Sequence, residues 1–369
     1  MSVRPLIIDL GREYRGGQHQ ALLLLQGLRE RGHAPELIAL GHSLLASRAK
    51  ESGVPVHEIT PSWRRAAAAA KIRELVRNCR VEIVHANEPH ALTAAWLARA
   101  HRNVPVIVSR RIALPLSPGF SLARYRAAAR IVAVSHFVER SVIESGLSAT
   151  QLAVIYDGVQ IPPEISPSHR ESARRQFGIP QDARCIGNVA AFVPEKGHAL
   201  LLRAFAKLKA KFPASVLLLR GEGPQLPALQ TLARELGVDE AARFLPASTD
   251  VETMFAAMDV FAFPSHEEPL GSALLAAMAH ALPVAAIARG GVPEVVENGR
   301  NGLLVADLDP RTFASNIVRL FAHPDEAIHL GAAARETVRA RFSVTRMVEE
   351  TVRLYEHLIA KGGALNSGD

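Results

Sequence analysis

The residues in this sequence whose types and spacing suggest chemistry lie in three short segments, of which residues 264–284 are the most informative. There the acidic pair Glu267-Glu268 follows a short apolar run, directly before the start of an apolar helix. A carboxylate accepts hydrogen bonds from sugar hydroxyls, while free backbone amides at a helix start suit a diphosphate. The amides concerned belong to Leu270, Gly271 and Ser272. The segment predicts a ligand that carries both groups, although two ordinary surface acids in a loop would give the same pattern.

The second segment, residues 188–198, places Lys196 beside Gly197 at the start of another expected helix. A lysine in this position can neutralise a diphosphate leaving group, because its point charge adds to the helix dipole. A solvated surface lysine remains the alternative interpretation.

The third segment follows the first apolar run of the chain and contains Gly16, Gly17 and Gln18 at the opening of a helix. Paired glycines allow backbone amides to approach a phosphate or a sugar, and the helix dipole favours negative charge there. A tight strand-to-helix turn without a ligand would look the same. The segment lacks the GxGxxG pattern of dinucleotide binders, which counts against a dehydrogenase.

These three segments are positioned by short apolar runs that alternate with stretches of helical period, as in βαβ units. In the first half, strands are expected at residues 6–10, 36–40, 83–85, 106–109, 131–134 and 152–155. A second series begins near residue 184 with CIGNVA, SVLLLR, ARFL, DVFAFP, LPVAAIA and NGLLV. The sequence predicts an α/β protein with two parallel sheets, whose ligands bind at the carboxyl ends of the strands.

The proline-rich stretch at residues 160–169 is typical of an interdomain linker. We therefore expect one domain over residues 1–160 and a second over residues 161–342. Ser343 is a plausible N-cap for a last helix that reaches about Lys361, followed by a frayed tail. Residues 343–369 are thus expected to form a C-terminal helix with its tail.

Composition limits the class of protein. The chain has 369 residues, 48% of them hydrophobic and 21% charged, which suits two globular domains rather than a disordered protein. Cys79 and Cys185 lie far apart, so neither a disulfide framework nor a zinc site is indicated, and a reducing cytosol is expected. No apolar run approaches the roughly 18 residues of a membrane span. A net charge of +7 favours anionic partners without choosing among them.

Taken together, these motifs resemble the retaining GT-B glycosyltransferases of family four, also called glycosyl transferases group 1, which include lipopolysaccharide-core and capsule enzymes. The resemblance runs over nearly the whole chain. It includes RGGQHQALLLLQGLRERGH, EIVHANEPHA, IVAVSHFVERSVIESG, VIYDGV, VPEKGH, GEGP, the 264–284 segment and GGVPEVVENGRNGLLV. It implies two Rossmann-like domains facing across a cleft. The first would lie on the acceptor side, the second would bind the nucleotide sugar, and the last helix would cross back to the first.

The resemblance also implies roles for individual residues. Glu268 matches the first glutamate of a paired-glutamate motif that contacts the donor sugar, and Lys196 matches a diphosphate lysine. Gly16 and Gly17 match a glycine loop near the donor phosphate and the acceptor. Glu222 and Gly223, in GEGP, lie in the stretch that borders the base.

A histidine of the first domain is also expected near the transferred sugar. His90 is the match, although Glu88 and His85 are close enough in sequence to leave the alignment open.

Two positions depart from the family pattern. The second glutamate of the motif, which usually holds the ribose, falls at Ala276, and an arginine that often precedes the lysine falls at Ala191. Losing one charged hydrogen bond removes about 1.5 to 3 kcal/mol, enough to weaken donor binding by one to two orders of magnitude. A degenerate nucleotide-binding homologue without transferase activity is therefore the alternative.

The implied reaction is a metal-independent hexosyl or heptosyl transfer with retention, from a nucleotide diphosphate sugar to a glycan or glycolipid in bacterial envelope or lipopolysaccharide synthesis. No cofactor is implied. The one DxD string, Asp307-Leu308-Asp309, is better interpreted as a strand end and the N-cap of a helix opened by Pro310 than as a metal site.

The acceptor half contains the basic segment 63–80 and the pair Arg110-Arg111. Such a surface would suit anionic lipid or a phosphorylated glycolipid, placing a cytoplasmic protein peripherally at the inner face of the membrane. A solvated helix face is the competing interpretation. A nucleotide-sugar epimerase would need an acid/base pair beyond the acidic loop, and a nucleic-acid binder would need aromatic residues interleaved with the basic ones, so both are disfavoured.

Overall fold

The computed structural model describes residues 2–78 and 80–366 of the chain. These residues form two compact units. Of the described residues, the first unit contains 2–78, 80–158 and 343–366, and the second contains 159–342. Cys185 is buried in the second unit, where burial raises the pKa of its thiol to about 12, whereas Cys79 lies outside the described residues.

The first unit is built on a seven-stranded parallel sheet in the order β3-β2-β1-β4-β5-β6-β7. Its strands are β1 (Pro5–Asp9), β2 (Glu36–Leu40), β3 (Val56–Ile59), β4 (Ile83–Ala86), β5 (Val106–Arg110), β6 (Arg130–Ala133) and β7 (Leu152–Val154). Its helices are α1 (Gly16–Glu30), α2 (Leu44–Glu51), α3 (Arg64–Arg77), α4 (Pro89–Leu97), α5 (Phe120–Arg126), α6 (His136–Glu144) and α15 (Val344–Asn366). Short 3-10 turns, η1 (Pro61–Trp63), η2 (Ala100–Arg102) and η3 (Ala149–Gln151), complete it.

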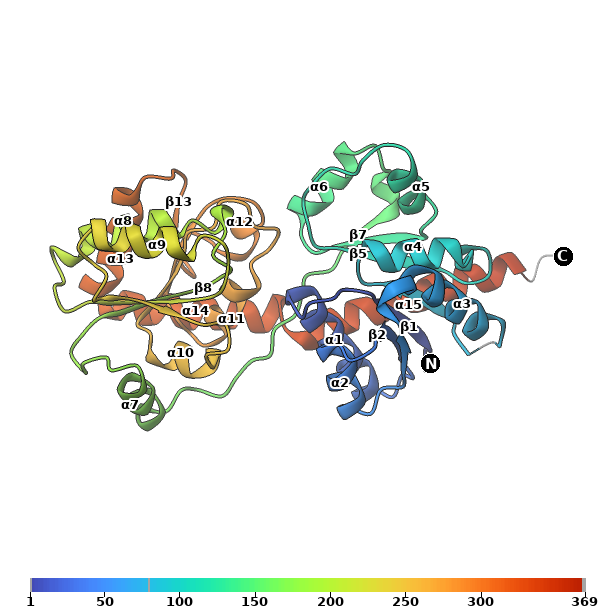
Figure 1. The fold of residues 1–369 in the computed structure, drawn as a ribbon, viewed down its shortest axis with the longest axis horizontal. Coiled ribbons are helices and arrows are strands. Elements are labelled where there is room, and N and C mark those ends of the chain that lie inside the picture. The colour runs from blue at the N-terminus through green and yellow to red at the C-terminus, as the bar shows by residue number, and fades with distance from the viewer. Residues whose placement is uncertain (1, 79, 367–369) are drawn as a thin grey trace. The chain divides into compact units, whose positions relative to one another are not determined.

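Helices cover both faces of this sheet, which explains why its central strands consist almost entirely of buried apolar residues. Helices α1, α2 and α15 pack on one face, while α3, α4 and α5 form the layer on the other (Figure 1). Leu22–Leu25 of α1 and the apolar side of α15 enclose one core with the strands. Helix α15 approaches α1 closely because Gly27 leaves room for Val348.

The second unit contains a six-stranded parallel sheet in the order β10-β9-β8-β11-β12-β13. Its strands are β8 (Cys185–Val189), β9 (Val216–Arg220), β10 (Ala242–Leu245), β11 (Val260–Phe263), β12 (Val284–Ile287) and β13 (Leu303–Val305). Its helices are α7 (Pro167–Gln176), α8 (His198–Lys209), α9 (Leu226–Glu235), α10 (Val251–Ala257), α11 (Ser272–Ala279), α12 (Val292–Val295), α13 (Pro310–Ala322) and α14 (Pro324–Arg341), with the 3-10 turn η4 (Pro194–Lys196).

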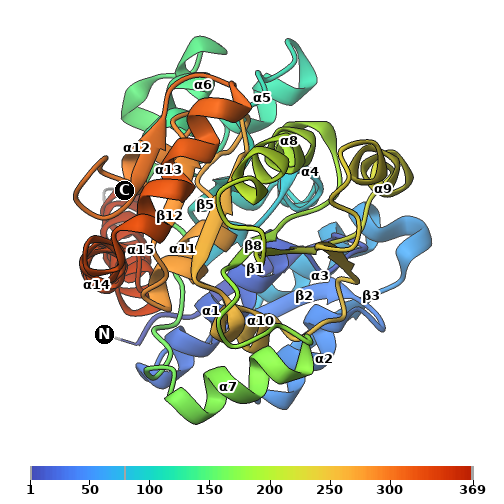
Figure 2. The same ribbon diagram turned by 90° about the vertical axis from the view of Figure 1, so that its left-hand side faces the viewer.

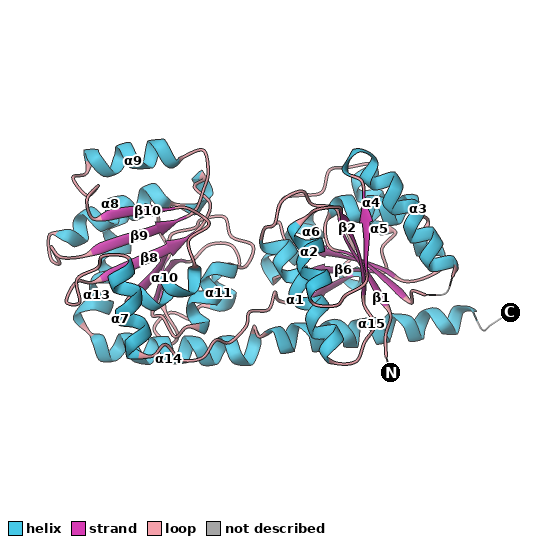
Figure 3. Ribbon diagram, turned by 60° about the horizontal axis from the view of Figure 1, so that its bottom comes forward, coloured by secondary structure: helices cyan, strands magenta, loops and turns pink. Residues whose placement is uncertain are grey.

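In this unit α8, α9 and α13 pack on one face of the sheet and share a core with it. Helices α10 and α7 lie on the opposite face, as seen from the side of this unit in Figure 2 and again in Figure 3. Helix α11 packs against α14. The α/β class with two parallel sheets, predicted from the alternating apolar runs, is confirmed.

Three local features differ from or refine the expectations. Strand β3 was not expected, and it is an edge strand with only one fully buried residue, Ile59. Helix α7 begins at Pro167, inside the predicted linker. Ser343 does cap α15, since its hydroxyl accepts from the amide of Arg346 at 3.3 Å, but the helix continues to Asn366 instead of ending near Lys361.

Candidate functional site

In both sheets the strand order reverses beside the first strand, and such a switch point leaves a crevice at the strand ends. In the second unit the reversal lies between β8 and β11, which pair directly. The loops after these two strands are the two that the sequence marked with Lys196 and Glu268. The fold therefore brings these segments, some seventy residues apart in the chain, to one place.

Lys196 and Glu268 form an ion pair at this switch point, with 2.6 Å between Nζ and Oε2. Their side chains are 22% and 12% exposed, so the pair is largely shielded but still accessible. The neighbouring Glu267 is exposed and has no ion pair among the described residues. The structure thus separates the acidic pair into one engaged carboxylate and one free one.

Gly197 allows the two loops to meet. It has a φ of +70°, a region that favours glycine, and a Cβ at this position would collide with the carbonyl oxygen of Pro264. The amide of His266 donates to the carbonyl of Glu195 at 3.0 Å and ties the loops together. A similar approach fixes Glu268, whose carbonyl accepts from the amide of Gly291 at 2.8 Å.

The N-terminus of α11 opens directly after Glu268. Gly271 occupies the N-cap with a φ of +103° and offers no capping side chain, and the first turn contains no acidic residue. The helix dipole and the amides around Leu270, Gly271 and Ser272 therefore favour an anion at this end. One cation, one carboxylate and an uncapped helix start lie at the same switch point.

The loop after β9 borders the same region. The amide of Phe192 donates to the carbonyl of Glu222 at 2.8 Å, and the amide of Gln225 donates to Phe192 at 3.0 Å. Gly223 has a φ of +156° and packs against the backbone of Phe192. The side chain of Glu222 is exposed, so its carboxylate is free to accept hydrogen bonds from a ligand.

The two departures from the family pattern have clear positions. Ala276 lies half-buried within α11, where its carbonyl accepts from Nδ1 of His280 at 2.8 Å. Ala191 is exposed in the loop after β8. Neither side chain can donate or accept a hydrogen bond.

Three buried polar groups near the Lys196 loop were not singled out from the sequence. Both ring nitrogens of His198, the hydroxyl of Ser265 and Oδ1 of Asn188 have no hydrogen-bond partner among the described residues. Burial, and then the charge of Lys196, lowers the pKa of His198 to about 4, so its ring is neutral near pH 7. Unsatisfied buried polar groups of this kind are uncommon away from functional sites. In the sequence, the one indication of them was that they lie in the segments 188–198 and 264–284.

In the first unit the switch point lies between β1 and β4. Gly16 and Gly17 form the first turn of α1, and Gln18 supports this turn in two ways. Its Oε1 accepts from the amide of Arg15 at 3.1 Å, and its Nε2 donates to the carboxylate of Asp9 at 3.1 Å. Through these hydrogen bonds Gln18 holds the glycine turn to Arg15 and Asp9.

A largely buried polar network continues from Asp9 and was missed by sequence reasoning because its members come from four separate segments. Asn87 donates to Asp9 at 2.6 Å and to the carbonyl of Gly17 at 3.0 Å. Arg111 donates to the side-chain oxygen of Asn87 at 2.8 Å and to Asp157 at 3.0 Å. The network fixes the glycine turn against β4, β5 and the strand-end residue Asp157.

The structure distinguishes the three residues proposed near the transferred sugar. His85 is buried and bonded to Tyr355 at 2.6 Å and to Ser109 at 2.7 Å. Glu88 caps α4 and accepts from the amides of His90 at 2.6 Å and Ala91 at 2.7 Å. Burial raises the pKa of Glu88, although the His90 amide opposes this shift. The exposed side chain is that of His90.

The basic pair Arg110-Arg111 does not form the open cationic surface that was one of its two interpretations. Arg110 is buried against the ring of Tyr125 and donates to the carbonyl of Leu114, while Arg111 is held by Asp157. Both guanidinium groups therefore have their partners inside the first unit. Asp309, in contrast, caps α13 as predicted, because its carboxylate accepts from the Arg311 amide at 2.8 Å.

The described residues contain no group of three or more His, Cys, Asp or Glu side chains able to hold a metal ion. Within the same part of the chain, no helix combines the length and apolar character that a bilayer crossing requires.

Comparisons with known proteins identify the family of the chain. The model described as glycosyl transferases group 1 matches residues 169–337, and the model described as glycosyltransferase family 4 matches residues 14–161. The D-inositol 3-phosphate glycosyltransferase of Geodermatophilus obscurus is 31% identical over 327 residues, which cover 81% of this chain and 72% of that protein. This chain spans about half the length of other relatives with the same name.

Solved structures show the same fold. A glycosyltransferase from Rickettsia africae has a TM-score of 0.87 at 21% identity, covering 97% of this chain and 99% of its own. Anabaena Alr3699/HepE, solved in complex with UDP-glucose, has a TM-score of 0.82 at 24% identity, covering 96% of this chain and 100% of its own.

The two parallel sheets and the similarity to these solved structures show that the fold is of the GT-B class. The chain belongs to the glycosyltransferase family that the group 1 and family 4 models describe.

Proposed function

We propose that this chain is a retaining glycosyltransferase that moves a sugar from a nucleotide diphosphate sugar to a glycan or glycolipid acceptor. The observation that carries the proposal is the meeting of Lys196, Glu268 and the uncapped start of α11 at one switch point. The UDP-glucose bound to the structurally similar Anabaena protein supports a donor of this kind.

The second unit supplies the donor contacts. Lys196 and the amides of Leu270, Gly271 and Ser272 stabilise the charge that develops on the departing diphosphate. Glu268 accepts hydrogen bonds from the hydroxyls of the donor sugar, with Glu267 exposed beside it. The Glu222-Gly223 loop borders the base.

The first unit supplies the acceptor contacts, with Gly16, Gly17 and Gln18 at its switch point and His90 exposed at the start of α4. The acceptor oxygen forms a bond to the anomeric carbon while the bond from that carbon to the diphosphate oxygen breaks. The hydroxyl proton passes to the leaving phosphate, and attack on the departing face retains the configuration. Because Lys196 and the helix amides neutralise the leaving group, the reaction proceeds without a metal.

The same proposal assigns the protein to the synthesis of bacterial envelope polysaccharide or lipopolysaccharide, as a hexosyl- or heptosyltransferase. It acts in the cytoplasm, in peripheral contact with the inner face of the membrane. The shared name of the relatives, D-inositol 3-phosphate glycosyltransferase, adds phosphorylated polyols to the acceptors to be assayed.

A non-catalytic nucleotide-binding protein is the second candidate, because Ala276 and Ala191 lack the polar side chains of the family pattern. The test is thermal stabilisation against a panel of nucleoside diphosphates and nucleotide sugars, followed by assays of donor hydrolysis and transfer. We expect stabilisation by one base and turnover of its sugar nucleotide. Binding without hydrolysis or transfer would favour the second candidate, and folded protein that no millimolar nucleotide stabilises would refute the donor site.

A further inference from the structure

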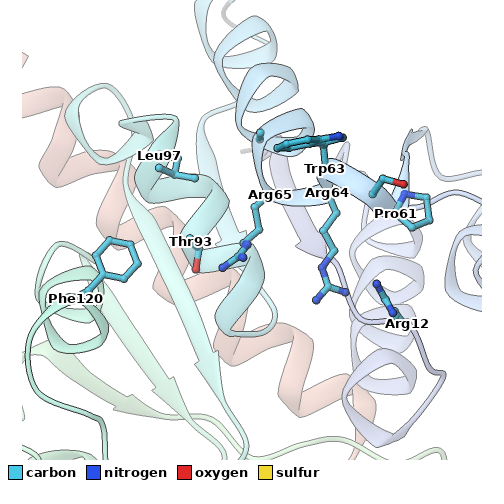
Figure 4. Close-up of a pocket in the computed structure, with 10 residues that line it drawn as sticks. Arg12, Pro61, Trp63, Arg64, Arg65, Thr93, Leu97 and Phe120 are labelled. Carbon is cyan, nitrogen blue, oxygen red and sulfur yellow. The ribbon is translucent and has the colours of Figure 1, made fainter.

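One cavity is lined only by residues of the first unit and contains none of the proposed donor contacts. Its volume is about 590 Å³, within the usual range for a small-molecule site. The loop after β1, the turn η1, the start of α3, helix α4 and Phe120 form its walls (Figure 4). The lining residues that carry the argument are Arg12, Trp63, Arg64, Arg65, Thr93 and Phe120.

The charge of this cavity is one-sided. Arg12, Arg64 and Arg65 line it, and no Asp or Glu does so among the described residues. Arg64 donates to the carbonyl of Leu10 at 3.0 Å, whereas Arg12 and Arg65 have neither an ion pair nor a hydrogen bond in the described part of the chain. Like charges that share one pocket repel each other, and a bound anion offsets that repulsion.

The pKa of His90, at the start of α4, reflects the same concentration of positive charge. This pKa is lowered first by burial and then by the charges of Arg64, Arg65 and Arg124. The nearby carboxylate of Glu88 accepts hydrogen bonds from backbone amides, and Glu88 does not line the cavity.

Phe120 gives the cavity an aromatic wall across from Arg12 and Arg64 (Figure 4). Phe120 is 52% exposed, yet its ring is fixed by the guanidinium of Arg124 at 4.8 Å and by an edge contact with Trp96 at 5.1 Å. Trp63, which directly precedes Arg64 in the chain, also lines the cavity and is 78% exposed. A fixed, exposed ring facing unpaired guanidinium groups suits a ligand with one anionic end and one apolar or sugar-ring face.

We propose that this cavity binds a phosphate group carried by the acceptor, with Arg12, Arg64 and Arg65 as its ligands. Guanidinium forks match the tetrahedral oxygens of phosphate and donate two hydrogen bonds each. Arg12 belongs to the loop that ends at the glycine turn, and Arg64 anchors α3 to the same loop through Leu10. The cavity therefore adjoins the proposed acceptor contacts within the first unit. That this phosphate belongs to the acceptor rests on the proposed function, whereas phosphate binding by the cavity does not.

The test uses the intrinsic fluorescence of the full chain. The sequence has two tryptophans: Trp63 lines the cavity, and Trp96 contacts Phe120, so both report on it. Wild type and the double variant R12Q/R65Q are titrated with inorganic phosphate and with glycerol 1-phosphate. We expect a saturable change in wild type and binding about a hundredfold weaker in the double variant, since each charged contact is worth about tenfold.

The control is R77Q, which removes a cation from the other end of α3 and should leave phosphate binding unchanged. A second variant, R12K/R65K, keeps the positive charges but loses the paired donors of the guanidinium groups. Its phosphate affinity should therefore fall between those of wild type and R12Q/R65Q. Circular dichroism confirms that each variant is folded. Equal phosphate affinity in wild type and R12Q/R65Q, or no saturable change with either probe, overturns the proposal.

Vesicle sedimentation separates the sources of the phosphate. If phosphatidylglycerol vesicles bind wild type, phosphatidylcholine vesicles do not, and inorganic phosphate competes, the phosphate is carried by a lipid. If inorganic phosphate binds and both vesicles fail, the acceptor is a soluble phosphorylated molecule. Nucleotide binding is measured separately by thermal stabilisation, so a chain that binds phosphate in the cavity but no nucleotide refutes the proposed function and leaves this site standing.

Discussion

Replacing Glu268 by Gln tests the pairing of Lys196 most directly. The substitution keeps the size and the hydrogen-bonding ability of the side chain but removes its charge. In the free protein Glu268 and Lys196 neutralise each other, so a diphosphate must compete with the carboxylate for the lysine. We expect E268Q to bind the bare nucleoside diphosphate more tightly than wild type does, while sugar transfer falls at least about a hundredfold.

The magnitude follows from the geometry of the pair. Two unit charges 2.6 Å apart attract each other by about 6 kcal/mol at an effective dielectric of 20. Desolvation of both groups cancels most of this, and their exposures of 22% and 12% allow further screening, which leaves a net coupling of about 1 to 2 kcal/mol. Releasing Lys196 should therefore tighten diphosphate binding by about five- to thirtyfold.

Isothermal calorimetry with the nucleoside diphosphate that stabilises wild type measures this change, and a transfer assay measures the loss of activity. The matched control is E297Q, because Glu297 pairs with Arg300 at the same 2.6 Å but with side chains that are 46% and 77% exposed. It should alter neither quantity. Weaker diphosphate binding by E268Q, or transfer at the wild-type rate, would show that the pair does not have the role described.

Three further predictions concern other parts of the molecule. Gly197→Ala should lower the free energy of unfolding by about 2 kcal/mol or more in urea titrations, since it adds strain at positive φ and a collision with Pro264; an unchanged midpoint would contradict this. Ala276→Glu should tighten donor binding about tenfold in calorimetry, because it supplies the missing charged acceptor, and no gain would mean that the ribose lies elsewhere. Burial lowers the pKa of His85 to about 3 from an unfolded value near 6.5, so its contribution is complete above pH 6.5 and is lost as the pH falls toward 3. Wild type should lose about 2 kcal/mol more stability than His85→Gln between pH 7 and pH 5, and parallel pH profiles would exclude this cause.

Much of the fold could be predicted because buried parallel strands are short, continuous apolar runs. The run LPVAAIA, for example, becomes β12, with all four strand residues Val284–Ile287 buried. The exception is informative. Strand β3 carries His57 and Glu58 at the sheet edge, where one side is open to polar residues, and it therefore lacks the apolar signal.

The candidate site was predictable where one local segment carries it. Lys196 and Glu268 each lie in a recognisable loop, but their ion pair depends on the adjacency of β8 and β11, which no local pattern gives. The Asp9-Asn87 contact likewise joins residues 78 positions apart, and nothing in the spacing of the chain reveals it. The roles of these residues stay predictions.

Helix α15 has a consequence for how the chain reaches its native state. The first sheet is complete at residue 154, yet its covering core includes Met347, Val348, Tyr355 and Leu358, which are synthesised only after the second unit. The hydroxyl of Tyr355 also meets His85 in the interior. During translation the second unit can therefore close while the first still exposes an apolar face to the solvent. A nascent chain released before α15 emerges should therefore be a substrate for chaperones or proteases, because the core of the first unit is still incomplete.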